Sequence, residues 1–217
     1  MDLKARAEFS KNYLSRLQLL LSSLDCNSIA SFVAKLMDAR ERGSQIFFIG
    51  NGGSASTASH FANDISIGTR SLGKPFRALS LCDNSSVITA IANDYGYDQI
   101  FLKQLQAQLL PGDLVIAISA SGNSANLLRA IEFAKRTGAY TIGLTGFDGG
   151  HLKNLVNLSV HIATEKGLYG PVEDIHMVLD HLVSACIVAE LQEEKEDAPQ
   201  DLLGVRAKSF VDENLVT

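Results

Sequence analysis

A glycine-rich turn with titratable residues close behind it is the part of this sequence that most directly suggests chemistry. The apolar run 46–49 leads into Gly50, Asn51, Gly52, Gly53 and Ser54, and His60 and Asp64 follow. A strand, a glycine turn and a helix N-terminus together bind anions, because the backbone comes close and free N–H groups point at the ligand. Residues four apart share one helix face, so His60 and Asp64 would be neighbours. The segment predicts chemistry on a phosphorylated small molecule.

A second loop of the same kind strengthens this prediction. The apolar run 114–118 reads as a buried parallel strand and is followed by Ser119, Ala120, Ser121, Gly122, Asn123 and Ser124. Serine hydroxyls and backbone N–H groups both donate to phosphate oxygens. Each loop alone is also compatible with ordinary helix capping by Gly and Ser. Two such loops in one chain favour a phosphate site.

The elements that must position these loops alternate along the chain. Apolar runs predict strands near 45–50, 76–81, 113–118, 140–145 and 157–162, and helical patterns lie near 54–66, 85–93, 97–108, 123–137 and 172–192. Such alternation predicts an α/β fold: a doubly wound, mainly parallel five-stranded sheet with helices on both faces. Ligands of such folds collect at the carboxyl ends of the strands, where both loops would lie.

Two further helical patterns precede the first strand, at 3–24 and 28–42. Asn27 and Ser28 are candidate caps for the second pattern, and Gly43 is a candidate stop. The two helices could cover a face of the sheet or pack against another subunit, and the sequence leaves both open. We expect one domain over residues 1–192 and a polar tail over 193–217.

Composition excludes several classes of function. The chain has 217 residues, a net charge of −5 and no Lys/Arg-rich block, which disfavours nucleic-acid binding. No apolar run reaches the length of a membrane span, and residues 1–6 lack the apolar core of a signal peptide. Cys26, Cys82 and Cys186 are scattered, which fits buried thiols in a reducing cytoplasm. We therefore expect a cytoplasmic protein with no membrane or nucleic-acid partner.

The motifs together resemble the SIS (sugar isomerase) domain and, within it, the phosphoheptose isomerase family. The likeness runs from about residue 5 to 192 and is carried by the segments 50–54, 60–62, 92–96, 119–126 and 144–150. It implies a doubly wound sheet with leading helices, assembled as a homotetramer with sites between subunits. Members characteristically isomerise sedoheptulose 7-phosphate to a heptose 7-phosphate. Some relatives are instead non-catalytic, such as a replication-initiator-associating protein, and a phosphosugar sensor or protein binder is our alternative.

The resemblance assigns roles residue by residue. The phosphate-gripping hydroxyls of the family match Ser54, Ser119, Ser121 and Ser124, within loops that include Gly52 and Gly53. Ala120 stands where the family often has Thr, so one donor is missing. Asn51 and Asp94 match positions that line the sugar site. The phosphate end of the pattern is therefore largely intact.

The metal and sugar end departs from the family. His60 and His181 match its histidines, Asp64 stands where the family has a Glu that is metal ligand and base, and Glu173 stands in place of a Gln. Two imidazoles and two carboxylates suit Zn²⁺ or a similar divalent ion. We expect Asp64 or Glu173 to be the carbon base of an enediol(ate) mechanism and His181 the proton shuttle. His176, three residues after Glu173 on the same helix face, is a rival, and Asp180, seven residues after Glu173, shares that face too.

Overall fold

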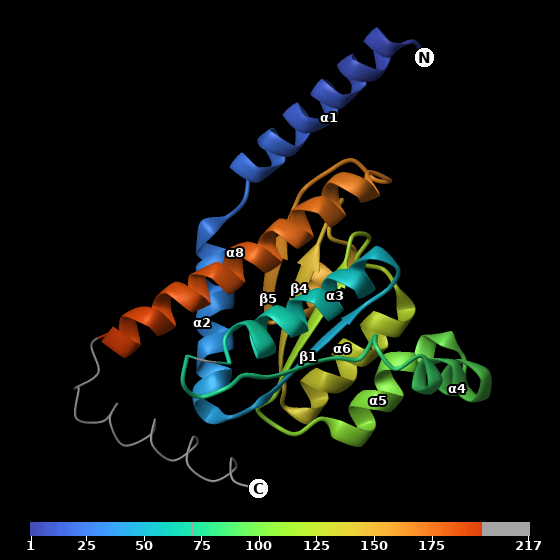
Figure 1. Ribbon diagram of the computed structural model, residues 1–217. Helices are drawn as coiled ribbons and strands as arrows, with labels where there is room; N and C mark the ends of the chain where they lie inside the picture. Colours follow the sequence, from blue (N-terminus) through green and yellow to red (C-terminus); the bar gives the residue numbers. More distant parts are fainter. Residues whose placement is uncertain (71, 197–217) are drawn as a thin grey trace, which may run out of the picture.

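The computed structural model describes residues 1–70 and 72–196, and its centre is a five-stranded parallel sheet (Figure 1). The strands are β1 (Gln45–Gly50), β2 (Arg77–Ser80), β3 (Leu114–Ser119), β4 (Tyr140–Thr145) and β5 (Leu158–His161), in the spatial order β2-β1-β3-β4-β5. Every pairing is parallel, with Ile46 opposite Leu114 and Gly50 opposite Ile118. The doubly wound α/β prediction is confirmed. The strand order reverses between β1 and β3, which is where such folds bind ligands.

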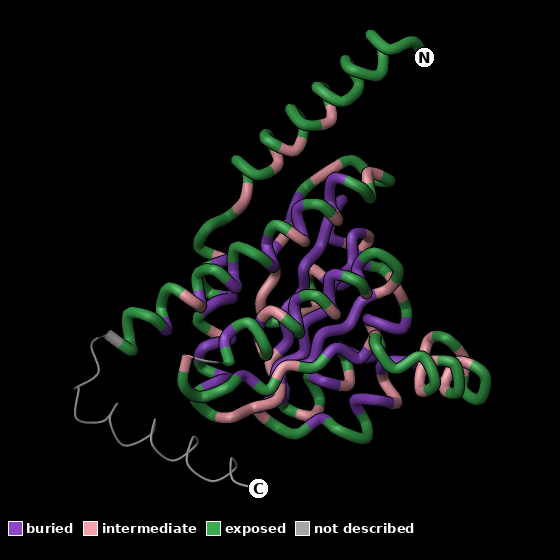
Figure 2. The backbone as a smooth tube through the Cα atoms, viewed as in Figure 1, coloured by how far each residue is buried: buried purple, intermediate pink, exposed green. Residues whose placement is uncertain are grey.

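Both faces of the sheet are covered, as the uninterrupted apolar strands predict. Alternate residues of β1 enter different cores: Ile46 and Phe48 join one cluster, while Phe47 and Ile49 join the other. Figure 2 shows the central strands β1, β3 and β4 as a buried layer, whereas the edge strands β2 and β5 are partly exposed. The first cluster packs against α2 and α8, and the second against α5 and α6. The loops at the carboxyl ends of β1 and β3 are thus held by rigid elements on both sides.

The helices follow the predicted pattern with a few differences. They are α1 (Leu3–Ser22), α2 (Cys26–Arg42), α3 (Gly53–Asn63), α4 (Ser85–Tyr95), α5 (Ile100–Gln108), α6 (Ala125–Thr137), α7 (Gly150–Leu155) and α8 (Tyr169–Glu196), with a π-helical turn η1 (Asp64–Gly68) and a 3-10 turn η2 (Tyr97–Gln99). The short α7 was not predicted, because a single turn and a half carries too little periodicity. α8 continues through Glu196, four residues into the predicted tail, and residues 197–217 lie outside the described part.

The two leading helices behave differently. α2 buries Ile29, Phe32 and Leu36 against the sheet, whereas no residue of α1 is buried. α1 reaches away from the domain in Figure 1, and its Phe9 and Leu14 are exposed. The N-cap of α2 is Asp25, so the predicted cap at Asn27 and Ser28 is wrong; the Asp25 carboxylate accepts the Asn27 N–H, and the helix begins two residues earlier.

Two further properties concern the cysteines and the length of the helices. Cys26 and Cys186 are exposed and Cys82 is half-buried, so the expectation of three buried thiols is wrong. Cys26 and Cys186 lie on helix faces that do not meet the core. No single described helix is long and apolar enough to cross a membrane; only α1 and α2, bent by 70° relative to each other, reach that length and composition together.

Candidate functional site

A pocket of about 140 Å³ lies where the loops after β1 and β3 meet. We call it the loop pocket; it is lined by Asn51, Ser54, Ile118, Ser119, Ala120, Ser121, Ser124, Tyr169 and Glu173. The structure therefore brings together the hydroxyl and amide residues that the sequence predicted from two separate segments. Ala120, where a hydroxyl is missing, instead packs with Phe147 and Val172.

Two helix N-termini reach this pocket without a side-chain cap. α3 begins after Gly52, whose φ of 54° lies in the left-handed region, and α6 begins after Ser124; neither residue makes a capping hydrogen bond through its side chain. The capping interpretation of these loops required the Ser124 hydroxyl to be occupied by the α6 backbone. A helix N-terminus with free N–H groups carries a partial positive charge, and two of them favour an anion.

An amide pair joins the two loops. Asn51 Nδ2 donates to Asn126 Oδ1 at 2.9 Å, and Asn126 Nδ2 donates to Asn51 Oδ1 at 2.8 Å. Asn126 is buried, and the Leu127 N–H also donates to its Oδ1 at 2.9 Å. The Tyr97 hydroxyl, from η2, donates to Asn51 Oδ1 at 2.9 Å. The loop after β1 is thereby fixed to the start of α6. Sequence reasoning missed Asn126 and Tyr97, because nothing in their spacing indicates this pairing.

Glu173 forms one wall of the loop pocket, against the first turn of α3. A Cβ atom on Gly53 would collide with the Glu173 carboxylate, so glycine at this position lets the carboxylate lie where it does. The same reasoning applies to Gly122, where φ is 63° and a Cβ would meet the Gly149 carbonyl. Among the described residues lining the pocket there is no Lys or Arg. The lining therefore offers an anion neutral donors and helix dipoles, beside one carboxylate.

Asp94 does not line this pocket. It is exposed near the end of α4, where its carboxylate accepts a hydrogen bond from Asn93 Nδ2 at 2.9 Å. The sugar-site role that the resemblance gives to Asp94 remains a prediction.

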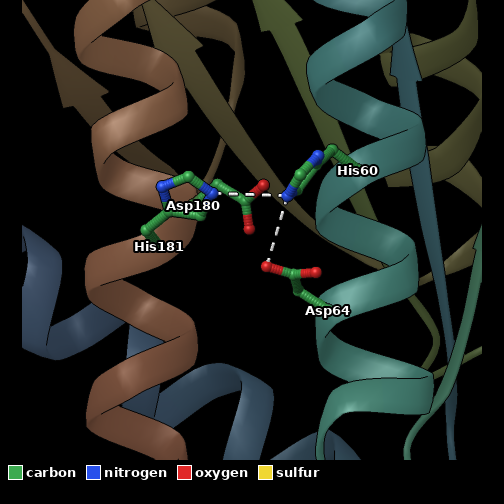
Figure 3. Close-up of side chains that lie close together, drawn as sticks. All are labelled: His60, Asp64, Asp180 and His181. Atoms are coloured by element: carbon green, nitrogen blue, oxygen red, sulfur yellow. Dashed lines mark hydrogen bonds and ion pairs between the residues drawn. The ribbon is translucent and has the colours of Figure 1, made fainter.

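A second group of titratable side chains lies between α3, η1 and α8 (Figure 3). Its members, which we call the His/Asp group, are His60, Asp64, Asp180 and His181, and one ligand atom from each lies within 4.8 Å of all the others. His60 Nε2 is 3.5 Å from Asp64 Oδ2 and 3.3 Å from His181 Nε2. Ligands about 2.1 Å from a tetrahedral ion are about 3.4 Å apart, which both distances match.

Asp180 is the member whose environment most needs a cation. Its side chain is fully buried, and its Oδ2 atom has no hydrogen-bond partner, while Oδ1 accepts from the Ser184 hydroxyl at 3.4 Å. Burial, with the nearby Asp64 charge adding to it, raises the pKa of Asp180 to about 7. An orphaned buried carboxylate oxygen is costly unless a positive charge satisfies it. The donor set and this unsatisfied atom fit a divalent metal ion.

Three of the four predicted metal ligands therefore lie together, and Glu173 is not among them. Asp180 is the fourth member of the group, one residue before His181 on α8. Successive residues of a helix point about 100° apart, so Asp180 reaches the group from the buried side and His181 from the exposed side. His176, one turn earlier, is fully buried and outside the group; burial lowers its pKa to about 4.

Comparison with known proteins places the chain among sugar-phosphate enzymes. The SIS domain family matches residues 11–146. A protein of Thermoplasma acidophilum named "Probable phosphoheptose isomerase" is 36% identical over 178 residues, covering 82% of this chain and 97% of the relative. The phosphoheptose isomerase of Trichlorobacter lovleyi is 39% identical over 155 residues, covering 70% and 79%. The solved phosphoheptose isomerase of Neisseria gonorrhoeae superimposes with a TM-score of 0.77 at 29% identity, covering 87% and 100%.

Proposed function

The chain belongs to the SIS domain family, and we propose that it is an aldose–ketose isomerase that converts sedoheptulose 7-phosphate to D-glycero-D-manno-heptose 7-phosphate or acts on a closely related phosphosugar. The observation that carries the proposal is the loop pocket, where two uncapped helix N-termini and four serines meet a carboxylate. The relatives named as phosphoheptose isomerases supply the substrate class.

In our proposal the phosphate binds at the serine side of the pocket. The serine hydroxyls and the free N–H groups of α3 and α6 donate to its oxygens, and the N–H groups are held in place by their helices before the ligand arrives. Fixed donors lose little freedom on binding, so the phosphate end can orient the sugar chain toward Glu173.

Glu173 is our choice for the base that moves the proton between C1 and C2. Its carboxylate takes the proton from C1 to give the enediol(ate) and returns it to C2. The C1 hydroxyl gives up its proton and the C2 oxygen gains one in the same exchange, so the C1 oxygen becomes the new carbonyl and the protein ends unchanged. Asp64, the other candidate, belongs to the His/Asp group, where its oxygen lies 3.5 Å from His60. The proton-shuttle role expected of His181 conflicts with ligation through the same nitrogen, so we assign His181 as a ligand.

The His/Asp group would hold the metal through His60, Asp64, Asp180 and His181, in place of a set that includes Glu173. When bound there, a divalent ion such as Zn²⁺ supplies positive charge that polarises the sugar carbonyl. The four side chains come from α3, η1 and α8, which are rigid elements that keep the ligand atoms in place.

We also propose that the protein is a cytoplasmic homotetramer and that α1 contributes to its subunit contacts. Exposed apolar side chains on α1, among them Phe9, Leu14 and Leu19, support a packed partner. We expect the double substitution Leu14→Lys and Leu19→Lys to yield smaller assemblies by light scattering, because charges do not enter an apolar interface. A double substitution of exposed polar residues on α1, Lys4→Glu and Lys11→Glu, is the control. An unchanged mass for the Leu variant would contradict this role of α1.

The proposed function is tested by a turnover assay on the zinc-loaded full chain with sedoheptulose 7-phosphate, in which NMR follows the aldose. We expect turnover that is lost after chelation and restored by Zn²⁺. The opposite result would be a folded, oligomeric protein that binds sedoheptulose 7-phosphate but converts neither it nor other ketose phosphates. That result would establish the non-catalytic SIS-domain alternative.

A further inference from the structure

We propose that Tyr97 and Asn126 are positioning residues that make Asn51 a hydrogen-bond donor to the sugar part of the bound phosphosugar. The inference rests on the proposed function, since it concerns the same pocket. It begins from the network that joins the loops after β1 and β3 and from the number of hydrogen bonds that each carboxamide can form.

One backbone N–H group identifies which atom is oxygen and which is nitrogen in the carboxamides of Asn126 and Asn51. The Leu127 N–H can only donate, so the Asn126 atom that it meets at 2.9 Å is the oxygen. The other atom of that carboxamide is therefore the NH₂ group, which donates to Asn51 at 2.8 Å and identifies the Asn51 acceptor as Oδ1. The Tyr97 hydroxyl, 2.9 Å from the same oxygen, must then donate as well.

In this arrangement the Asn51 side chain has a free hydrogen-bond donor but no free acceptor. A carboxamide oxygen accepts two hydrogen bonds, and Asn51 Oδ1 already receives them from Tyr97 and Asn126. Of the two N–H groups on Asn51 Nδ2, one is used by Asn126 Oδ1 at 2.9 Å and one remains. Asn51 lines the loop pocket, so it can offer a ligand an N–H donor and no acceptor.

Position indicates which part of the ligand receives this donor. Asn51 lies between buried Asn126 and Tyr97, which is 58% exposed, and so on the outward side of the pocket. Ser119 and Ser54 are buried residues, each 5% exposed, whereas Asn51 is half-buried. A phosphate held by the buried serines directs its sugar chain outward, where the Asn51 N–H meets a carbonyl or hydroxyl oxygen.

The test compares two ligands on two matched variants of the full chain. Tyr97→Phe removes one of the two residues that hold the Asn51 carboxamide, so Asn126 alone restrains it and Asn51 Oδ1 has an open acceptor site. Tyr95→Phe removes a hydroxyl from the same segment at a similar exposure, 61%, and the Tyr95 hydroxyl has no hydrogen bond within residues 1–70 and 72–196. Calorimetry measures the Kd of inorganic phosphate and of sedoheptulose 7-phosphate for each variant.

We expect Tyr97→Phe to weaken sedoheptulose 7-phosphate binding by about 3–10-fold, the usual effect of one hydrogen bond. Inorganic phosphate binding should stay within about twofold of the unsubstituted protein, and Tyr95→Phe should change neither ligand. An equal loss of both ligands would show that Tyr97 merely supports the loop and would overturn the inference, as would no loss at all. Failure of the unsubstituted protein to bind either ligand would instead overturn the proposed function.

Discussion

Replacing Glu173 with Gln should reduce turnover of the phosphosugar by about 10²–10⁴-fold while strengthening the binding of inorganic phosphate. The first effect follows because a carboxamide cannot accept the proton from carbon, and a positioned base contributes a factor of that size. The second follows because Glu173 is the carboxylate lining a pocket in which the described residues supply no Lys or Arg. Removing a like charge favours anion binding, and for two unit charges about 7 Å apart in water the factor is about threefold. The measurements are kcat by NMR and the phosphate Kd by calorimetry.

Opposite directions for turnover and phosphate affinity distinguish a base from a phosphate ligand or a metal ligand. Asp174→Asn is the matched control: the same chemical change one residue along α8, at an exposed side chain that accepts a hydrogen bond from the Tyr13 hydroxyl at 2.5 Å. It should alter neither quantity by more than about twofold. His181→Gln should also lose turnover, but with loss of bound zinc, which Glu173→Gln retains. Zinc loss in Glu173→Gln would restore Glu173 to the ligand set that the sequence predicted.

The sheet was predictable from the sequence because its physics is local. Each strand is a short, continuous apolar run, and residues such as Phe47 and Phe48 must enter cores on opposite faces whatever lies around them. The position of the Gly/Ser loops was predictable for the same reason. Each follows a parallel strand directly, so both must lie at the edge of the sheet where the strands have their carboxyl ends. The short α7 escaped because it has no comparable pattern.

The site was only partly predictable because its groups are joined by tertiary contacts. His60 and Asp64 share a helix face, and their proximity could be read from a spacing of four. Whether Glu173 or Asp180 completes the metal group depends on how far α8 extends past the pocket and how it lies against α3. Both residues fall on one face of α8, and only the packed structure separates them, with Glu173 against Gly53 and Asp180 beside His60.

Replacing Asp180 with Asn should weaken zinc binding while making the metal-free protein more stable. Loss of a residue that merely supports a ligand costs about 10–100-fold in metal affinity, and loss of a direct ligand should cost at least that much. Without metal, however, the ionised Asp180 carboxylate is buried beside Asp64 with one oxygen unsatisfied. A neutral carboxamide of the same shape avoids that cost. Zinc competition with a chromogenic chelator and thermal unfolding of the chelated protein measure the two effects.

The pH dependence gives this prediction its sign. The pKa of Asp180 rises from an ordinary value of 3.8 to about 7 in the folded protein, so between these values the unfolded chain is ionised there while the folded one is protonated. Folding then takes up a proton, and stability from this group falls as pH rises from about 4 to 7. The Asp180→Asn variant does not lose stability in this way as pH rises. The difference in free energy of unfolding between the variant and the unsubstituted protein should therefore be small at pH 4, grow toward pH 7 and level off above it. At pH 8 we expect about 1–4 kcal/mol, or several degrees in Tm.

Comparison of the two proteins at each pH removes the contribution of His176, whose lowered pKa affects both equally. Glu190→Gln, at an exposed position on the same helix, should show no such pH-dependent difference. A variant that is less stable than the unsubstituted chain at pH 8, or one that binds zinc normally, would show that Asp180 is a structural residue outside the metal site. A gain of stability together with a loss of zinc binding is the result expected of a metal ligand. Such a buried carboxylate destabilises the metal-free protein but binds the cation when it is present.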